Sequence, residues 1–126
     1  MSGELPPEAQ EKLQKLQELQ QQISQITVQK EESQAQLNET ESAIEALEET
    51  DDGTDVYRSV GDVMISKDHD ETLDDLEEDK ETLEVRVKQL ESREEKAQEK
   101  FENLRGEVQQ MLGGLGGGLG GPGAAQ

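Results

Sequence analysis

The sequence has few of the residues from which compact protein interiors are built. Among 126 residues there is no cysteine and no tryptophan, and there are only one tyrosine, one phenylalanine and three prolines. The lack of cysteine excludes disulfide bonds and thiolate metal sites. Because 29% of the residues are hydrophobic and 34% are charged, the chain has the length of one domain but too little apolar mass to fill a globular core.

Long apolar segments and an excess of basic residues are missing as well. No segment approaches the roughly 18 continuous apolar residues of a membrane-spanning helix. The first ten residues, MSGELPPEAQ, lack the basic and apolar regions of a secretion signal. We therefore expect a cytoplasmic protein with no membrane partner. The net charge of −19, from 31 acidic and 12 basic residues, disfavours nucleic acid as a partner because its phosphates are also negative.

The acidic excess is spread along the sequence. The net charge is −8 over residues 1–50, −5 over residues 51–72 and −6 over residues 73–112, which predicts a diffusely acidic surface. Such a chain repels itself unless salt screens the charges, and the Debye length falls to about 3 Å at about 1 M salt. We therefore expect a halophilic protein that works in a very salty cytoplasm.

The sequence does contain a heptad repeat, in two stretches of nearly equal length at residues 8–50 and 70–112. The a positions fall at every seventh residue from 16 to 44 and from 73 to 108, each followed three residues later by a d position. Of these 22 seam positions, 17 are apolar, where chance would place about 6. This periodicity predicts two long coiled-coil helices and argues against intrinsic disorder.

Signals for helix ends lie between the two stretches. Gly53 is placed to take the left-handed conformation after the first helix. Asp68, with Glu71 three residues later, has the pattern of a capping box that starts the second helix. If the two helices pack antiparallel, a positions against d positions, two registers remain, which place either Ile26 or Ser33 opposite Glu94.

The segment between these helix ends predicts a β-hairpin. Gly61-Asp62 separates two β-rich runs, residues 56–60 and 63–66, and favours a type II′ turn. An isolated two-stranded hairpin is marginal in water and leaves both edges unpaired. We therefore predict that the strands pair with strands of other subunits. The residues expected at this oligomerisation surface are Val56, Tyr57, Val60, Gly61, Val63, Met64 and Ile65.

These features predict a mainly α fold, a long antiparallel coiled-coil hairpin with a short β-hairpin at the bend. The strands are expected to join those of other subunits in a β-barrel-like hub. The expected segments are an extended leader at 1–7, a first helix at 8–52, the oligomerisation hairpin at 53–67, a second helix at 68–112 and a flexible Gly- and Leu-rich tail at 113–126.

No pattern indicates catalysis, a cofactor or a metal. His69, the only histidine, lies among acidic residues without convergent metal ligands, and we interpret it as an exposed residue at a helix start. The acidic residues from 51 to 55 lack the spacing of a calcium loop. The glycine-rich tail lacks the Lys-Ser/Thr of a phosphate-binding loop. Since a two-helix stem offers no sheltered site for paired carboxylates, we expect no enzyme activity.

Apolar residues at the helix ends opposite the bend exceed what a two-helix seam requires. Leu13 and Leu112, for example, occupy e positions beside the seam. One interpretation is that these helix ends fray and still pack locally. We favour an exposed apolar tip that binds a partner, because an apolar patch on an acidic surface marks an interaction site. The residues of the expected tips are Leu5, Leu13, Leu16, Phe101, Leu104, Val108, Met111 and Leu112.

Several short segments can be compared with known families. They are VYRSVG at 56–61, VMI at 63–65, ETLEVRV at 81–87, Pro6-Pro7 and the glutamines at 20–22. Together with the order helix, β-hairpin, helix, they resemble the prefoldin family, and within it the archaeal beta type, which has a single hairpin. The resemblance covers roughly residues 5 to 112. The heavy acidity and the Gly/Leu tail depart from the family.

The resemblance implies an ATP-independent holdase without a cofactor. It implies a hetero-hexamer of two alpha and four beta subunits, in which the hairpins form joined β-barrels. The coiled-coil tips would hold unfolded proteins and deliver them to a group II chaperonin. Docking to the chaperonin by charge would need salt screening or basic sites on the partner. The alternative is a structural coiled-coil scaffold or tether with fixed protein partners.

Overall fold

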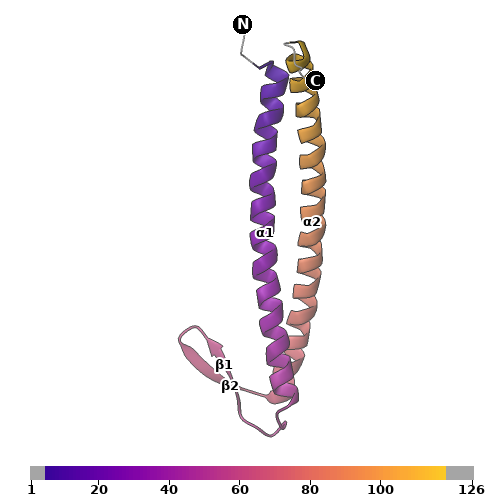
Figure 1. The fold of residues 1–126 in the computed structure, drawn as a ribbon. Helices are drawn as coiled ribbons and strands as arrows, with labels where there is room; N and C mark the ends of the chain where they lie inside the picture. Colours follow the sequence, from indigo (N-terminus) through magenta and orange to yellow (C-terminus); the bar gives the residue numbers. More distant parts are fainter. Residues whose placement is uncertain (1–4, 119–126) are drawn as a thin grey trace. The chain divides into compact units, whose positions relative to one another are not determined.

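The fold consists of two long helices joined by a β-hairpin (Figure 1). This computed structural model describes the backbone of residues 5–118 and the side chains of residues 5–114. The order of elements confirms the predicted helix, hairpin and helix. Parts of the predicted leader and tail, residues 1–4 and 119–126, lie outside the described residues. The elements are α1 (Pro7–Glu48), β1 (Val56–Val60), β2 (Val63–Lys67) and α2 (His69–Gly118).

The chain divides into two compact units, each containing part of α1 and part of α2. The terminal unit comprises residues 1–27 and 92–126, and the bend unit comprises residues 28–91 with the β-hairpin. Within each unit the two helix segments lie side by side and run antiparallel. In the terminal unit, for example, Lys12 near the start of α1 forms an ion pair with Glu107 near the end of α2.

The core of each unit is the helix seam that the heptads predict. All 22 predicted a and d positions are buried or half-buried, whereas most positions between them are exposed. In the terminal unit the Thr27 hydroxyl donates to Glu94 Oε2 at 2.7 Å, which places Glu94 beside Ile26 as the first of the two registers requires. The most deeply buried apolar residues are Ala9, Leu37, Ile44, Val87, Leu90, Ala97 and Val108.

The end of α1 is capped by Thr50 and by the ring of His69, neither of which was predicted to cap it. Thr50 donates its backbone N–H to the Leu47 carbonyl at 3.1 Å and its hydroxyl to the Ala46 carbonyl at 2.6 Å. The prediction for Gly53 was wrong, because its backbone is not in the left-handed region. Because Thr50 and the ring of His69 form hydrogen bonds with these carbonyls, the last turn of α1 does not need a glycine in the left-handed conformation to satisfy them.

The two ends of α2 differ in how well they were predicted. At the start, Asp68 Oδ2 accepts the backbone N–H of Glu71 at 3.0 Å, which confirms the predicted N-cap. At the other end α2 continues to Gly118, beyond the predicted helix end at residue 112. This extension contains no proline. Glycine lowers helix stability by about 1 kcal/mol relative to alanine but keeps its backbone donor.

The β-hairpin has the predicted turn. β1 and β2 pair antiparallel, and the Val60–Val63 pair closes the turn. Gly61 has φ +58°, whereas Asp62 does not have positive φ, a combination that fits type II′ and excludes type I′. Glycine takes this conformation without the steric cost of a Cβ atom. Within the described residues the sheet has only these two strands, so both outer edges carry unpaired backbone groups.

Candidate functional site

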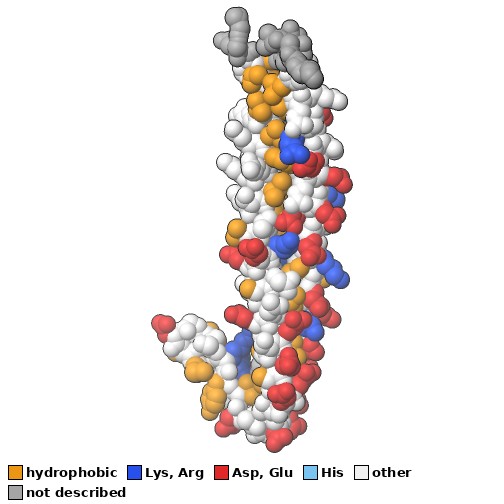
Figure 2. All heavy atoms as spheres, in the orientation of Figure 1, with side chains coloured by type: hydrophobic (Ala, Val, Ile, Leu, Met, Phe, Trp, Pro, Cys, Tyr) orange, Lys and Arg blue, Asp and Glu red, His pale blue; other side chains and the backbone are white. Residues whose placement is uncertain are grey.

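The β-hairpin carries most of the large apolar side chains that are exposed in the described part of the chain. Five of the seven such residues lie on it, with exposed fractions of 42–70%, and Figure 2 shows apolar side chains gathered at the outside of the hairpin. Of the other predicted oligomerisation residues, Val56 is half-buried and Gly61 forms the turn. The exposed five are Tyr57, Val60, Val63, Met64 and Ile65.

The strand register divides the hairpin into two unlike faces. Arg58 and its partner Ile65 share one face, which is turned toward α2 because Arg58 Nη2 lies 3.7 Å from Asp79 Oδ2. Side chains alternate along a strand, so Tyr57 and Met64 lie on the other face. Val60 and Val63 pair next to the turn and share the face of Arg58 and Ile65, so exposed apolar side chains lie on both faces. The face turned away from α2 therefore offers an aromatic and a thioether side chain between two open edges.

His69, at the base of the hairpin, is buried rather than exposed. Its side chain is 7% exposed, Nε2 lies 2.8 Å from the Leu47 carbonyl, and Nδ1 lies 3.0 Å from Asp70 Oδ1. The hydrogen bond to Asp70 and then that to Leu47 raise the pKa of His69 above its ordinary value. The interpretation as an exposed residue was wrong because position 69 lies one heptad before the d residue Leu76 and so continues the seam.

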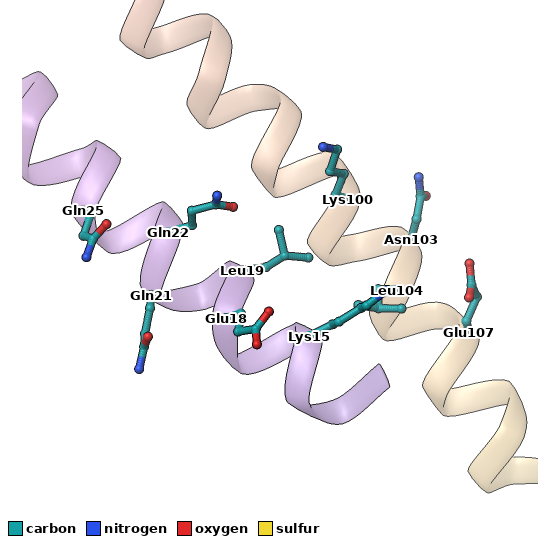
Figure 3. Close-up of a pocket in the computed structure, with 10 residues that line it drawn as sticks. All are labelled: Lys15, Glu18, Leu19, Gln21, Gln22, Gln25, Lys100, Asn103, Leu104 and Glu107. Atoms are coloured by element: carbon teal, nitrogen blue, oxygen red, sulfur yellow. The ribbon is translucent and has the colours of Figure 1, made fainter. Parts of the chain in front are cut away.

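The terminal unit contains an open groove of about 650 Å³ between α1 and α2 (Figure 3). Leu19 and Leu104 contribute its apolar surface, and both are half-buried. The rest of its lining is polar. Its amide side chains both donate and accept hydrogen bonds, so the groove can accept an apolar side chain together with the backbone of an extended peptide. The polar lining residues are Lys15, Glu18, Gln21, Gln22, Gln25, Lys100, Asn103 and Glu107.

The groove was not predicted from the sequence, although part of its pattern is visible there. Glu18, Gln22 and Gln25 follow one another at intervals of three or four residues, which places them on one side of a helix. Leu19 was predicted only as a d residue of the seam, and its place in the lining of the groove was not predicted. The heptad pattern shows which residues pack between the helices, but it does not show where side chains leave space beside them.

The predicted tip residues all lie within the described residues, and none is strongly exposed. Val108 is buried at 4% exposed, and the other seven are half-buried. Leu104 is the one that lines the groove. The seven half-buried residues therefore pack in the seam with one part of the side chain and contact solvent with the rest. A partner can contact Val108 only if the helices part. The seven half-buried residues are Leu5, Leu13, Leu16, Phe101, Leu104, Met111 and Leu112.

An ion pair bridges the two helices beside this groove. Lys12 Nζ contacts Glu107 Oε1, and Glu107 also lines the groove. The hydrogen bond to Glu107 is the largest cause of a raised pKa of Lys12. Because both side chains are partly exposed, the pair adds little to stability and weakens further in salt. It is therefore a weak link between the two helices.

Within residues 5–118, no group of three or more His, Asp or Glu side chains is arranged to hold a metal ion. No helix in the same range combines the length and the apolar character needed to cross a membrane. The hairpin and the terminal groove are the candidate sites with exposed or accessible apolar side chains, and both have the chemistry of protein–protein contact.

Comparison with known proteins gives a consistent family. A family profile described as "Prefoldin subunit" matches residues 10–115. Proteins named "Prefoldin subunit beta" from Halobacterium salinarum and Natronomonas pharaonis are 47% and 48% identical to this chain over 78 residues, or 62% of it. The chain spans 62% and 60% of the length of these relatives.

A solved structure is also similar. The crystal structure of the prefoldin beta subunit from Thermococcus strain KS-1 matches with a TM-score of 0.78 and 34% sequence identity. The match covers 88% of this chain and 97% of that chain.

Proposed function

The chain belongs to the prefoldin family, and we propose on this premise that it is a beta-type subunit of an ATP-independent chaperone that holds unfolded proteins. The observation that carries the proposal is the hairpin, with five exposed apolar side chains on a two-stranded sheet with open edges. In a lone subunit these groups face water. Pairing with alpha subunits and other beta subunits covers them in a shared sheet. The proposed assembly contains two alpha and four beta subunits.

The proposed client site is the groove of the terminal unit with the half-buried apolar residues around it. Leu19 and Leu104 give apolar contact, and the amide side chains beside them bond to the backbone of an extended client segment. Each such site binds weakly, but several sites in one assembly bind one unfolded chain with high avidity. The proposal includes delivery of clients to a group II chaperonin in the cytoplasm, with no bound cofactor.

The hairpin is tested by placing a charge on its exposed face. Met64→Lys should prevent assembly with a candidate alpha subunit in high salt, because the lysine would have to be buried between strands of different subunits. Val28→Lys is the matched control, since Val28 is also exposed but lies on α1. Native light scattering measures the mass of each mixture. Equal masses for the two variants would refute assembly through this face.

The client site is tested with two leucines that occupy equivalent seam positions. Leu104 and Leu83 are both half-buried d residues, one in the terminal unit and one in the bend unit. Leu104→Gln should reduce suppression of aggregation of unrelated denatured proteins without nucleotide, whereas Leu83→Gln should retain it in assemblies of the same mass. Equal suppression would refute the groove. A wild-type assembly that suppresses the aggregation of no denatured protein would instead be a scaffold or tether.

A further inference from the structure

We infer that His69 is a positioning residue whose protonated ring clasps the end of α1 to the start of α2 and so fixes the base of the β-hairpin. Loss of the proton weakens this link. The clasp itself is a property of the bend unit. Its consequence for assembly rests on the proposed function, in which the hairpin joins the subunits.

The geometry requires two donors on one ring. Nε2 faces the Leu47 carbonyl at 2.8 Å and Nδ1 faces a carboxylate oxygen of Asp70 at 3.0 Å. Both partners are acceptors. A neutral imidazole has one N–H and one lone pair, whereas the imidazolium has two N–H groups. Only the protonated ring makes both hydrogen bonds, and at 7% exposed it has little access to water as a replacement.

The charges around the ring favour the same form. Asp70 on α2 and Asp52 on the loop after α1 both favour the cation. On the α1 side, Leu47 contributes its carbonyl, and the end of a helix carries partial negative charge. The partial positive charge at the start of α2 and the burial of the ring oppose the cation. The hydrogen bonds outweigh the burial, so the pKa of His69 is raised.

Deprotonation leaves the ring with one of its two bonds. If Nε2 keeps the proton, the lone pair of Nδ1 faces the Asp70 carboxylate, whose side chain is 74% exposed and can turn into water. If Nδ1 keeps the proton, the bond to the Leu47 carbonyl is lost. In both forms the positive charge beside the end of α1 disappears. The link therefore loosens in a graded way instead of breaking outright.

The clasp matters because it closes the loop that carries the hairpin. Leu47 and His69 lie on either side of the segment that contains β1 and β2. A second link, Arg58 to Asp79 at 3.7 Å, joins two half-exposed side chains, and such pairs add little. The direction in which the hairpin leaves the helices therefore depends on His69. A hairpin that is already oriented loses less freedom when partner strands pair with it.

The pH dependence follows from the direction of the shift. A raised pKa in the folded state means that the folded chain binds the proton more tightly than the unfolded chain. The stabilisation is therefore complete below about 6.5, the ordinary pKa of histidine. It is lost as pH rises through the higher pKa of the folded state.

The first experiment is an NMR titration of the full chain in high salt, in which the single histidine gives unambiguous ring signals. We expect the ring of His69 to titrate above the ordinary value, and Asp70→Asn to lower that pKa because the amide cannot replace the carboxylate charge. A ring that titrates at or below the ordinary value in the wild type, or one that does not respond to Asp70→Asn, would overturn the clasp.

The second experiment separates charge from packing with His69→Gln, which retains a side-chain donor but does not titrate. The difference in melting temperature between wild type and variant should be largest near pH 6 and should shrink toward pH 9. A difference that is independent of pH would make His69 a packing residue only. If the ring behaves as expected and assembly is unchanged over this pH range, the clasp stands and its role in assembly is refuted. The proposed function is unaffected by that result.

Discussion

The bend unit and the terminal unit differ sharply in charge. Each has 6 basic residues, but the bend unit has 22 acidic residues and the terminal unit has 9, so their net charges are −16 and −3. The expectation of a diffusely acidic surface was therefore wrong. Because the chain folds back on itself, its two least acidic stretches come together in one unit. The comparison shows that charge counted along a sequence does not give charge per folded unit.

The two units also differ in how they present apolar side chains. The hairpin of the bend unit holds five of them exposed, whereas the apolar residues of the terminal unit are half-buried in the seam. The apolar side chains of the hairpin are already exposed, so a complementary surface can pack on them without a change in the hairpin. The terminal unit offers a smaller apolar surface, contributed by Leu19 and Leu104 in the groove. This contrast suits a fixed contact between subunits at the hairpin and a variable contact with unfolded chains at the groove.

The largest expected effect is that of salt on the bend unit. At about 10 mM salt the Debye length is about 30 Å, and at about 1 M it is about 3 Å, so dilution restores repulsion among the 22 acidic residues. We expect low salt to reduce helicity by circular dichroism, with amide-exchange protection lost first in residues 28–91. If the terminal unit loses amide-exchange protection equally, the difference in charge does not determine which unit unfolds first.

The next largest effect is expected for the hairpin turn. Gly61→Val places a β-branched side chain at φ +58°, a strain of about 1–3 kcal/mol, and should prevent both hairpin formation and assembly. Gly53→Val is the matched control, because neither glycine has an atom near the added Cβ and Gly53 does not need positive φ. Analytical ultracentrifugation measures the size of the assembly that each variant forms. Normal assembly of the Gly61 variant would show that the turn does not determine the contact.

A smaller effect compares two buried valines of the seam. Val108→Ala in the terminal unit and Val87→Ala in the bend unit each remove two methyl groups from sites that are 4% and 7% exposed, which should cost about 1–2 kcal/mol. Urea unfolding measures this loss. If the helices must part to admit a client, Val108→Ala should increase client capture and Val87→Ala should not. Equal capture would show that parting is not required.

The smallest expected effect is a stabilisation of the terminal unit. Gly106 lies inside α2, and a Cβ added there meets no atom within 4 Å. Gly106→Ala should therefore stabilise the helix by about 0.5–1 kcal/mol, measured as a higher melting temperature. The same change should reduce client capture slightly, opposite to Val108→Ala. If both the melting temperature and client capture rise, client binding does not depend on local opening of the helices.

The features that were predicted correctly depend on local or periodic patterns. The heptads located the buried seam, Gly61-Asp62 located the turn, and Asp68 located the start of α2. The features that were missed depend on contacts between segments distant in sequence or run against local propensity. His69 is buried because α1 lies against it. The extension of α2 to Gly118 was missed because glycine disfavours a helix. Assembly and client contacts remain predictions because they depend on other chains.

The open edges of the β-hairpin have a consequence for the cell that makes this chain. A copy without partners displays unused backbone donors and acceptors beside exposed Tyr57 and Met64, so surplus copies are adhesive. In the proposed assembly, production of the different subunit types must therefore stay in proportion, or orphan copies must be degraded. On the proposed function, a protein that keeps other chains from aggregating is itself prone to aggregate until it is assembled.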